Sequence, residues 1–234
     1  MIKSHKAIKE LKEQNLLILD GVSPKQISEV SVDVPLGQYI FIEESTLGLT
    51  QKEIKECADP LPFIESNLRQ KYNFRSNEDV RRILNVWDRV EKIIEKAGRV
   101  WLKVDITEPL ILPRFTFFLA YLDQYIGTVG GSNIAMQFFL KSTGARHGLN
   151  HPLAGLAEPG YFSKLCVEIM PVVENFQIEK GDMIGQLLFG ETTPDFQDYA
   201  IKASYQKGST LDEVKLNWKP EDILPKAIKN IRDL

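Results

Sequence analysis

The sequence has few cysteines and no long apolar segment. Its two cysteines, Cys57 and Cys166, form no CxxC pair and are too few for a disulfide framework. No segment approaches the length of a membrane span, and the charged start MIKSHKAIKELKEQ lacks the apolar core of a signal peptide. We therefore expect a cytoplasmic protein without a membrane partner.

A surplus of positive charge is also absent. The 234 residues carry 29 Lys and Arg against 32 Asp and Glu, for a formal net charge of -3. Proteins that bind the phosphate backbone of nucleic acids usually have a basic surplus. Nucleic acid is therefore not an expected partner. The 43% of hydrophobic residues is typical of a globular protein with a sizeable core.

Several enzyme signatures are missing as well. The chain has no GxSxG nucleophile elbow, no phosphate-binding GxxxxGK loop and no dinucleotide-binding GxGxxG motif. The zinc-deaminase pattern, in which His or Cys stands two residues before Glu and a PCxxC motif follows, does not occur either. The sequence therefore does not favour a serine hydrolase, a P-loop enzyme or a dinucleotide-dependent enzyme. We also expect no catalytic metal.

The hydrophobic pattern that is present indicates a mainly β protein. Short apolar runs separated by Pro and Gly predict strands, among them LLILD, SVDVPLG, QYIFIEE, WLKVDI, FTFFLAYL, SNIAMQFFL, KLCVEIMPVV and MIGQLLF. Strands of this length and spacing favour a β-sandwich or barrel over βαβ units. We expect one domain over residues 1–234, with a short surface helix within residues 3–15.

One segment has a helical period instead. In SNEDVRRILNVWDRVEKIIEKAG the apolar residues recur every three or four positions, which is the pattern of an amphipathic helix packed on a core. Ser76 with Asp79 forms a capping signature, and Gly98 supplies a stop. The pattern predicts a helical insert at about residues 50–98.

A polar run, KSTGARHGL, follows the apolar stretch IAMQFFL. It offers the hydroxyls of Ser142 and Thr143, the cations of Lys141 and Arg146, and several backbone amides. Groups of this kind grip phosphate oxygens. A solvated turn is the alternative explanation, and the residues alone do not decide between the two.

A carboxylate interrupts the apolar strand within AEPGYFSKLCVEIMP. Strand alternation directs Cys166, Glu168 and Met170 to one face. Glu168 is then either exposed on an outer face or desolvated, with a raised pKa. The second alternative would provide a proton carrier near neutral pH, as general acid/base catalysis requires.

Five segments occur in an order that resembles one known family. SPKQISEVSVDVPLG, ILPRFTFFLAYLDQYI, KSTGARHGL, EPGYFSKLCVEI and KGDMIGQLLF are similar to the dCTP deaminase branch of the dCTP deaminase and dUTPase superfamily. The resemblance covers residues 1–45 and about 100–210, and leaves the helical insert unmatched. It implies a distorted β-barrel or β-clip of the dUTPase-like type, assembled as a homotrimer with active sites at the subunit interfaces.

The resemblance also implies hydrolytic deamination of dCTP to dUTP and ammonia. No catalytic cofactor is implied, and Mg²⁺ would arrive as a chelate of the triphosphate. Glu168 matches the catalytic glutamate, which exchanges protons with water, with N3 of the base and with ammonia. Ser142 and Arg146 match residues that hold the attacking water and the base. The expected nucleotide-binding residues are Lys141, Thr143, Gly144, Ala154, Glu158, Tyr161, Gln186, Tyr205 and Lys207.

Glu158 bears on the choice between activities. The dUTPase branch and the bifunctional members have Asp at this position to activate water, whereas Glu before Pro-Gly resembles the deaminase-only members. We therefore expect dUTP as the product. The alternatives are a dUTP pyrophosphatase or bifunctional enzyme that forms dUMP, and a non-catalytic nucleotide-binding regulatory relative.

Departures from the family pattern favour the last alternative. Pro35 and Lys141 replace arginines, Ser163 replaces a glycine, and Ser204 replaces a lysine. The last change lies in a shortened segment, YAIKASYQKGST, that resembles a phosphate-covering lid. Tyr205, Gln206 and Lys207 are its candidate contacts, and we expect residues 194–234 to form a flexible lid.

Overall fold

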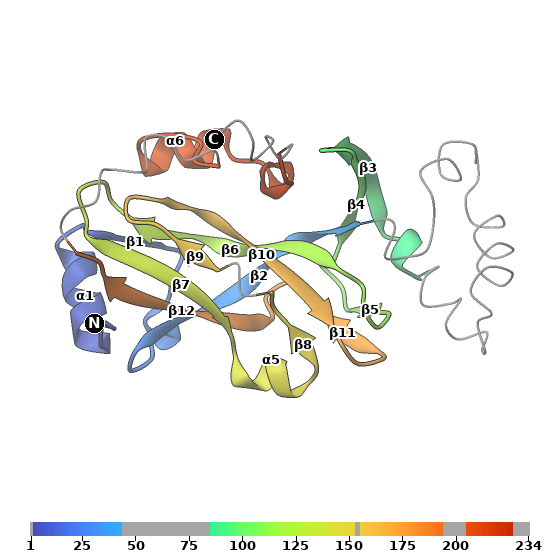
Figure 1. The fold of residues 1–234 in the computed structure, drawn as a ribbon, viewed down its shortest axis with the longest axis horizontal. Coiled ribbons are helices and arrows are strands. Elements are labelled where there is room, and N and C mark those ends of the chain that lie inside the picture. Colours follow the sequence, from blue (N-terminus) through green and yellow to red (C-terminus); the bar gives the residue numbers. More distant parts are fainter. Residues whose placement is uncertain (1, 44–84, 153–154, 194–204, 227–234) are drawn as a thin grey trace, which may run out of the picture.

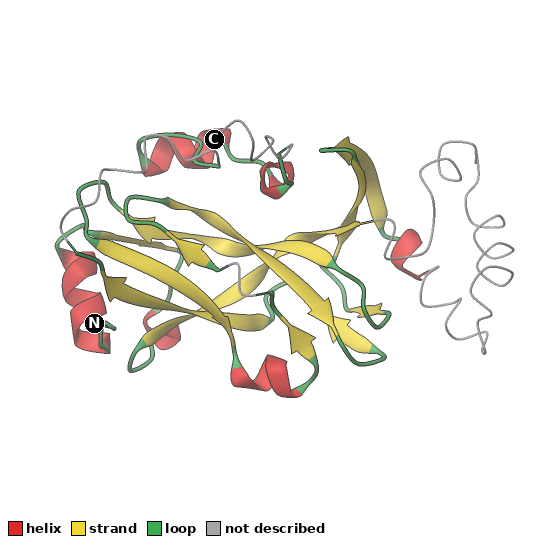
Figure 2. Cartoon of the chain, in the orientation of Figure 1, coloured by secondary structure: helices red, strands yellow, loops and turns green. Residues whose placement is uncertain are grey.

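The computed structural model describes residues 2–43, 85–152, 155–193 and 205–226 (Figure 1). Among the described residues, strands are far more extensive than helices, and the helices are short and peripheral (Figure 2). The expected mainly β class is therefore confirmed. The strands are β1 (Leu17–Asp20), β2 (Ser31–Glu43), β3 (Val90–Lys96), β4 (Arg99–Asp105), β5 (Leu110–Leu112), β6 (Phe118–Thr128), β7 (Ile134–Leu140), β8 (Leu149–Asn150), β9 (Leu156–Ala157), β10 (Phe162–Pro171), β11 (Phe176–Ile178) and β12 (Met183–Glu191).

The helices are α1 (His5–Glu13), α5 (Ser142–Arg146) and α6 (Leu211–Asn217), with short 3₁₀ turns η1 (Pro24–Gln26) and η4 (Pro220–Ile223). The expected N-terminal helix is α1, which Ser4 caps by accepting a hydrogen bond from the Ala7 N–H at 3.5 Å. Ile8 of α1 is fully buried, while most of the charged residues of this helix remain at the surface. Of the helices in the described residues, none is long and apolar enough to cross a membrane.

The main sheet is built around β2. Along the sheet the strands follow the order β8-β10-β6-β2-β12-β7-β9, while β1 also pairs with β6 and the β3–β4 hairpin joins through β4 to β2. β5 and β11 form a separate antiparallel pair. The first residues of β2 pair with β12, whereas its later residues pair with β4 and β6. Because one strand changes partners along its length, the sheet curls around the core (Figure 1).

The change of partner occurs at a bend. The pairing of β2 with β6 shifts register between Leu36 and Ile40. At Gly37 an added Cβ would lie 1.9 Å from the Cε2 atom of Tyr121, so the tyrosine ring fills the space of a side chain. The Tyr121 hydroxyl also accepts a hydrogen bond from the Gln38 N–H at 3.1 Å. The ring therefore covers the bend and ties it to β6.

Both faces of the sheet are buried near this bend. Ile40 of β2 and Ala120 of β6 belong to the main core inside the curl. Their neighbours Phe41 and Leu119 point the other way, into a second cluster that also contains Trp101. The apolar run FLAYL at the start of β6 follows from this arrangement, because a strand buried on both faces needs no polar alternation.

The C-terminal segment, residues 205–226, covers the second cluster (Figure 1). Ile223 and Leu224 are buried in that cluster, and the Trp218 ring packs edge-on against Tyr121 with centroids 4.9 Å apart. Thr210 and Glu213 cap α6 reciprocally. The part of the expected lid that the structure describes thus contains short helices packed on the sheet. Its role as a lid stays a prediction.

The prediction of a helical insert is wrong over Val90–Lys96, because these residues form strand β3, which pairs with β4. Gly98 is not a helix stop: with Ala97 it forms the turn of this hairpin, both at positive φ (72° and 55°). The β-branched residues of the segment satisfy a strand as well as a helical period, and pairing with β4 decides between them. Residues 85–87 are helical, while residues 44–84, including the Ser76 cap, lie outside the described residues.

Gly37→Ala should destabilise the fold by about 1–3 kcal/mol, because the new methyl group collides with the Tyr121 ring. Equilibrium urea unfolding followed by far-UV circular dichroism measures this loss. Gly190→Ala is the matched control, since this strand glycine has no neighbouring atom within 4 Å of an added Cβ. Its unfolding free energy should stay the same or rise by up to about 1 kcal/mol. Equal losses in the two variants would contradict the role of the bend.

Candidate functional site

A cavity of about 760 Å³ lies between β10, the turn before it, β4 and the C-terminal segment. Its size is in the range of pockets that hold small molecules. The residues that line it include Phe138, Gly155, Glu158, Tyr161, Cys166, Glu168, Tyr205, Trp218, Asp222 and Lys226.

Strand β10 places Glu168 in this cavity. Val167 and Ile169 point into the main core, so Cys166 and Glu168 face the opposite side, as the predicted alternation requires. Burial raises the pKa of the Glu168 carboxyl. Burial also raises the pKa of the Cys166 thiol, and the negative charge of Glu168 raises it further. Of the two environments open from the sequence, Glu168 therefore occupies the desolvated one.

An imidazole that was not predicted as a site residue faces one oxygen of Glu168. His151 Nε2 lies 3.8 Å from Glu168 Oε2. Both atoms are buried, and neither has a hydrogen-bond partner within the described residues. Burial lowers the pKa of His151 and so favours its neutral form. No local motif marks His151; the pairing of Asn150 with Met170 brings it beside Glu168.

Two contacts fix the imidazole. Its ring packs edge-on against Phe138 with centroids 4.9 Å apart, and a Cβ on Gly155 would lie only 3.2 Å from His151 Cε1. Phe138 is itself held over β12, because an added Cβ on Gly185 would lie 2.0 Å from its Cε2 atom. The Phe138 ring and the backbone at Gly155 and Gly185 thus determine where His151 lies.

Three of the predicted nucleotide-binding residues share the cavity with Glu168, namely Glu158, Tyr161 and Tyr205. Glu158 and Tyr161 belong to the turn before β10, closed by the Tyr161 N–H donating to the Glu158 carbonyl at 3.1 Å. Gly160 has a φ of 84° in this turn, which favours glycine. Burial raises the pKa of the Tyr161 hydroxyl to about 12, so this group stays protonated.

The predicted residues of KSTGARHGL lie elsewhere on the chain. Ser142, Thr143 and Arg146 are exposed on α5, and none of them lines the cavity of Glu168. Gly144 lies in the same short helix, near Leu149. One chain therefore does not bring Ser142 and Arg146 to Glu168. Ala154 lies outside the described residues.

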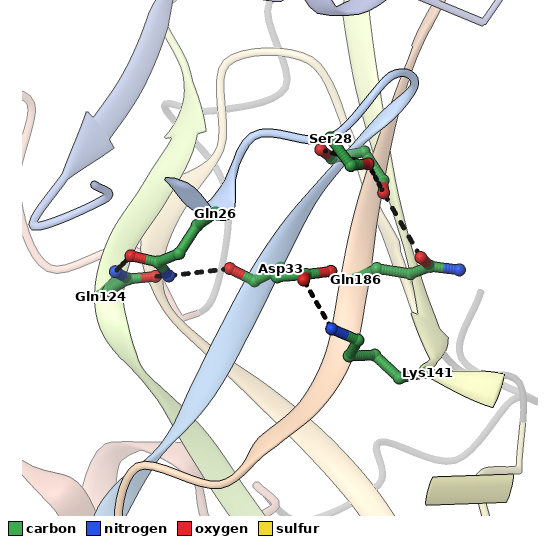
Figure 3. Close-up of polar contacts among 7 residues, drawn as sticks. Gln26, Ser28, Asp33, Gln124, Lys141 and Gln186 are labelled. Atoms are coloured by element: carbon green, nitrogen blue, oxygen red, sulfur yellow. Dashed lines mark hydrogen bonds and ion pairs between the residues drawn. The ribbon is translucent and has the colours of Figure 1, made fainter. Parts of the chain in front are cut away.

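Lys141 and Gln186 belong to a polar cluster that also contains Ser31 and Asp33 of β2 (Figure 3). The Lys141 ammonium forms an ion pair with Asp33, which the sequence analysis did not select. Gln186 accepts a hydrogen bond from the Ser31 hydroxyl at 3.3 Å. This cluster lies beside the start of α5, because Lys141 is the residue that precedes that helix.

In the C-terminal segment the predicted cation is already paired. Lys207 Nζ lies 2.6 Å from Asp222 Oδ1. Gln206 accepts a hydrogen bond from the Phe162 N–H at 3.1 Å, which joins the segment to the start of β10. Trp218 was not predicted; its ring lines the cavity and lies 5.3 Å from Lys164 Nζ.

The chain matches a family model described as dCTP deaminase-like over residues 2–192. It is 30% identical to a dCTP deaminase, dUMP-forming, of Nanoarchaeum equitans (strain Kin4-M), over 94% of this chain and 98% of that relative. A solved 2′-deoxycytidine 5′-triphosphate deaminase from Agrobacterium tumefaciens superposes with a TM-score of 0.49 at 15% identity, over 80% of this chain and 47% of that one. The chain thus spans about half the length of that solved chain. A native EIAV dUTPase gives a TM-score of 0.33 at 19% identity, over 46% of this chain and 89% of that one.

The family model reaches from the N-terminal helix through β12 and so includes Glu168 and α5, but not the C-terminal residues that also line the cavity. The resemblance drawn from five short segments is therefore confirmed, and the chain belongs to the dCTP deaminase-like family.

Proposed function

We propose that the protein hydrolyses dCTP to dUTP and ammonia, with Glu168 as the general acid/base. The observation that carries this proposal is the position of Glu168, whose carboxyl faces a small-molecule cavity and has a pKa raised by burial. A carboxyl with a raised pKa can both accept and return a proton near neutral pH. Membership in the dCTP deaminase-like family supports the choice of substrate.

The proposed reaction needs one carboxylate and one water. As the water oxygen bonds to C4 of cytosine, ionised Glu168 accepts a proton from it and passes that proton to N3. The C4–N4 bond then breaks, and the remaining hydroxyl proton goes through Glu168 to the amino group, which leaves as ammonia. C4 becomes a carbonyl, N3 keeps its proton and Glu168 is ionised again. Mg²⁺ would arrive as a chelate of the triphosphate.

We also propose that a second copy of the chain completes the site. Glu168 lines a cavity that α5 of the same chain does not reach, while Ser142 and Arg146 are exposed on α5. A homotrimer in which α5 of one subunit meets the cavity of its neighbour would bring these groups together. Ser142 and Arg146 would then hold the water and the base against Glu168.

A second candidate function is a bifunctional reaction that releases dUMP and pyrophosphate. It is favoured by the relative of 30% identity, whose name describes it as dUMP-forming. The Glu158 carboxylate lines the same cavity as Glu168, where it could activate a second water. Against it stands the longer side chain at a position where the family's dUMP-forming members are expected to have Asp.

Glu168→Gln should lower kcat for dCTP by about 10²–10⁴-fold, because the amide keeps the size of the side chain but cannot carry protons. Incubation with dCTP and Mg²⁺, followed by anion-exchange separation of dCTP, dUTP and dUMP, measures the turnover. The variant should still bind dCTP, as measured by isothermal titration calorimetry. Glu10→Gln on α1 is the control and should turn over normally. Near-normal turnover by Glu168→Gln would exclude the proposed mechanism.

Mixing two inactive variants tests the shared site. Glu168→Gln and Arg146→Ala, unfolded and refolded together in equal amounts, should recover about a quarter of the wild-type activity per chain. Each site then needs an intact half from each of two neighbouring chains. Each variant refolded alone is the control. Mixed trimers that stay inactive, with native mass by light scattering, would mean that the site is not shared.

The product distinguishes the two candidate functions. With Glu158 as a poor activator, the wild type should form dUTP without pyrophosphate, and Glu158→Asp should release measurable pyrophosphate from dCTP. Glu158→Gln is the control and should release none. If the wild type already forms dUMP and Glu158→Gln abolishes only that step, the bifunctional reaction is correct. Pyrophosphate release unchanged in every variant would remove Glu158 from the choice.

A further inference from the structure

We propose that His151 is a positioning residue that donates its Nε2–H to Glu168 Oε2 and thereby leaves Oε1 of the carboxylate for the water and the base. This inference rests on the proposed function, since it assigns a role beside the proposed general acid/base. It concerns a residue that carries no part of the deamination chemistry described above.

The geometry leaves the two atoms facing each other. His151 Nε2 and Glu168 Oε2 are 3.8 Å apart, both are shielded from solvent, and the described residues offer neither of them another hydrogen-bond partner. Buried polar atoms in folded proteins are nearly always paired. An approach of about 1 Å brings the pair to hydrogen-bonding distance, and catalytic hydrogen bonds often shorten in this way when substrate binds.

The imidazole is held in place, so it can donate a hydrogen bond in a fixed direction. Phe138 packs on its ring and the Gly155 backbone lies close to its Cε1 atom, so its orientation is restricted. Its side chain is only 3% exposed, against 28% for Glu168. The buried partner is therefore the fixed member of the pair, and the carboxylate is the one that also reaches the cavity.

A fixed N–H donor would have two effects on Glu168. It would hold one carboxylate oxygen, so that the second oxygen alone exchanges protons with the reacting atoms. It would also stabilise the ionised form, which opposes the effect of burial and keeps part of the population able to accept a proton. Burial of His151 favours its neutral form, in which the ring can donate without adding a charge.

Other ionisable groups line the cavity that Glu168 faces, and all of them are kept in the position-151 variants used below. The turn before β10 and β10 itself contribute Glu158, Tyr161, Lys164 and Cys166. Strand β4 contributes Arg99, and the C-terminal segment contributes Tyr205, Asp222 and Lys226. Their influence on the carboxyl is common to the wild type and to each substitution at position 151. A change in the pH profile between variants therefore reports the imidazole.

The kinetic test compares His151→Phe with His151→Gln. The phenyl ring keeps the packing against Phe138 but cannot donate, so kcat for dCTP should fall about 10- to 100-fold, the factor for one hydrogen bond to a charged group. KM should change little, and the acid limb of kcat/KM should move to higher pH. His151→Gln supplies an amide N–H and should restore most of kcat and the limb. Equal losses in both variants, with equal drops in melting temperature and no shift of the limb, would overturn the proposal.

A second measurement does not depend on activity. The chain has three histidines, so ¹⁵N NMR of the imidazoles can assign His151 by comparison with His5→Gln and His147→Gln. At neutral pH the Nε2 of His151 should carry the proton, and Glu168→Leu should shift this resonance while the other two histidines stay unchanged. A proton on Nδ1, or no response to Glu168→Leu, would overturn the pair. If the pair is present but dCTP is not deaminated, the proposed function fails and the His151–Glu168 contact stands.

Discussion

The bend of β2 at Gly37, with the Tyr121 ring lying on it, is the constraint on which the rest of the described structure depends. Without a side chain at Gly37, β2 can leave β6 and continue along β12, so one strand serves two parts of the sheet. The curl that results encloses the main core. The same Tyr121 ring belongs to the outer cluster and contacts Trp218, which docks the C-terminal segment. The bend, the outer cluster and the docked C-terminal segment therefore all contact a single side chain.

The candidate site follows from the alternation of β10 within this frame. One face of β10 is committed to the main core, so Glu168 faces the layer between the sheet and the C-terminal segment. Burial in that layer raises the pKa of the Glu168 carboxyl, yet the layer also contains a cavity. The same covering segment supplies one wall of the cavity in front of Glu168. Burial and access are both provided by residues distant in the sequence.

Much of the fold could be predicted from the sequence, because strands and turns leave local patterns. The alternation in KLCVEIMP correctly assigned Glu168 to the face opposite Val167 and Ile169. The helix expected across Val90–Lys96 failed because its β-branched residues suit both periods and only the pairing with β4 selects one. His151 and Asp33 could not be found locally, since strand register brings them to Glu168 and Lys141. Nor could one chain's pattern reveal that α5 and the Glu168 cavity are separate.

Phe138 connects positions that lie far apart in the sequence. Its ring occupies the space above Gly185 and also packs edge-on against His151, while the Gly155 backbone lies close to both residues. A relative that gains a side chain at the Gly185 position must shrink Phe138, and the imidazole then loses the surface that orients it. These four positions are therefore not free to drift one at a time. Their substitutions should be correlated across descendants of this sequence, although one of them, Gly185, carries no functional group at all.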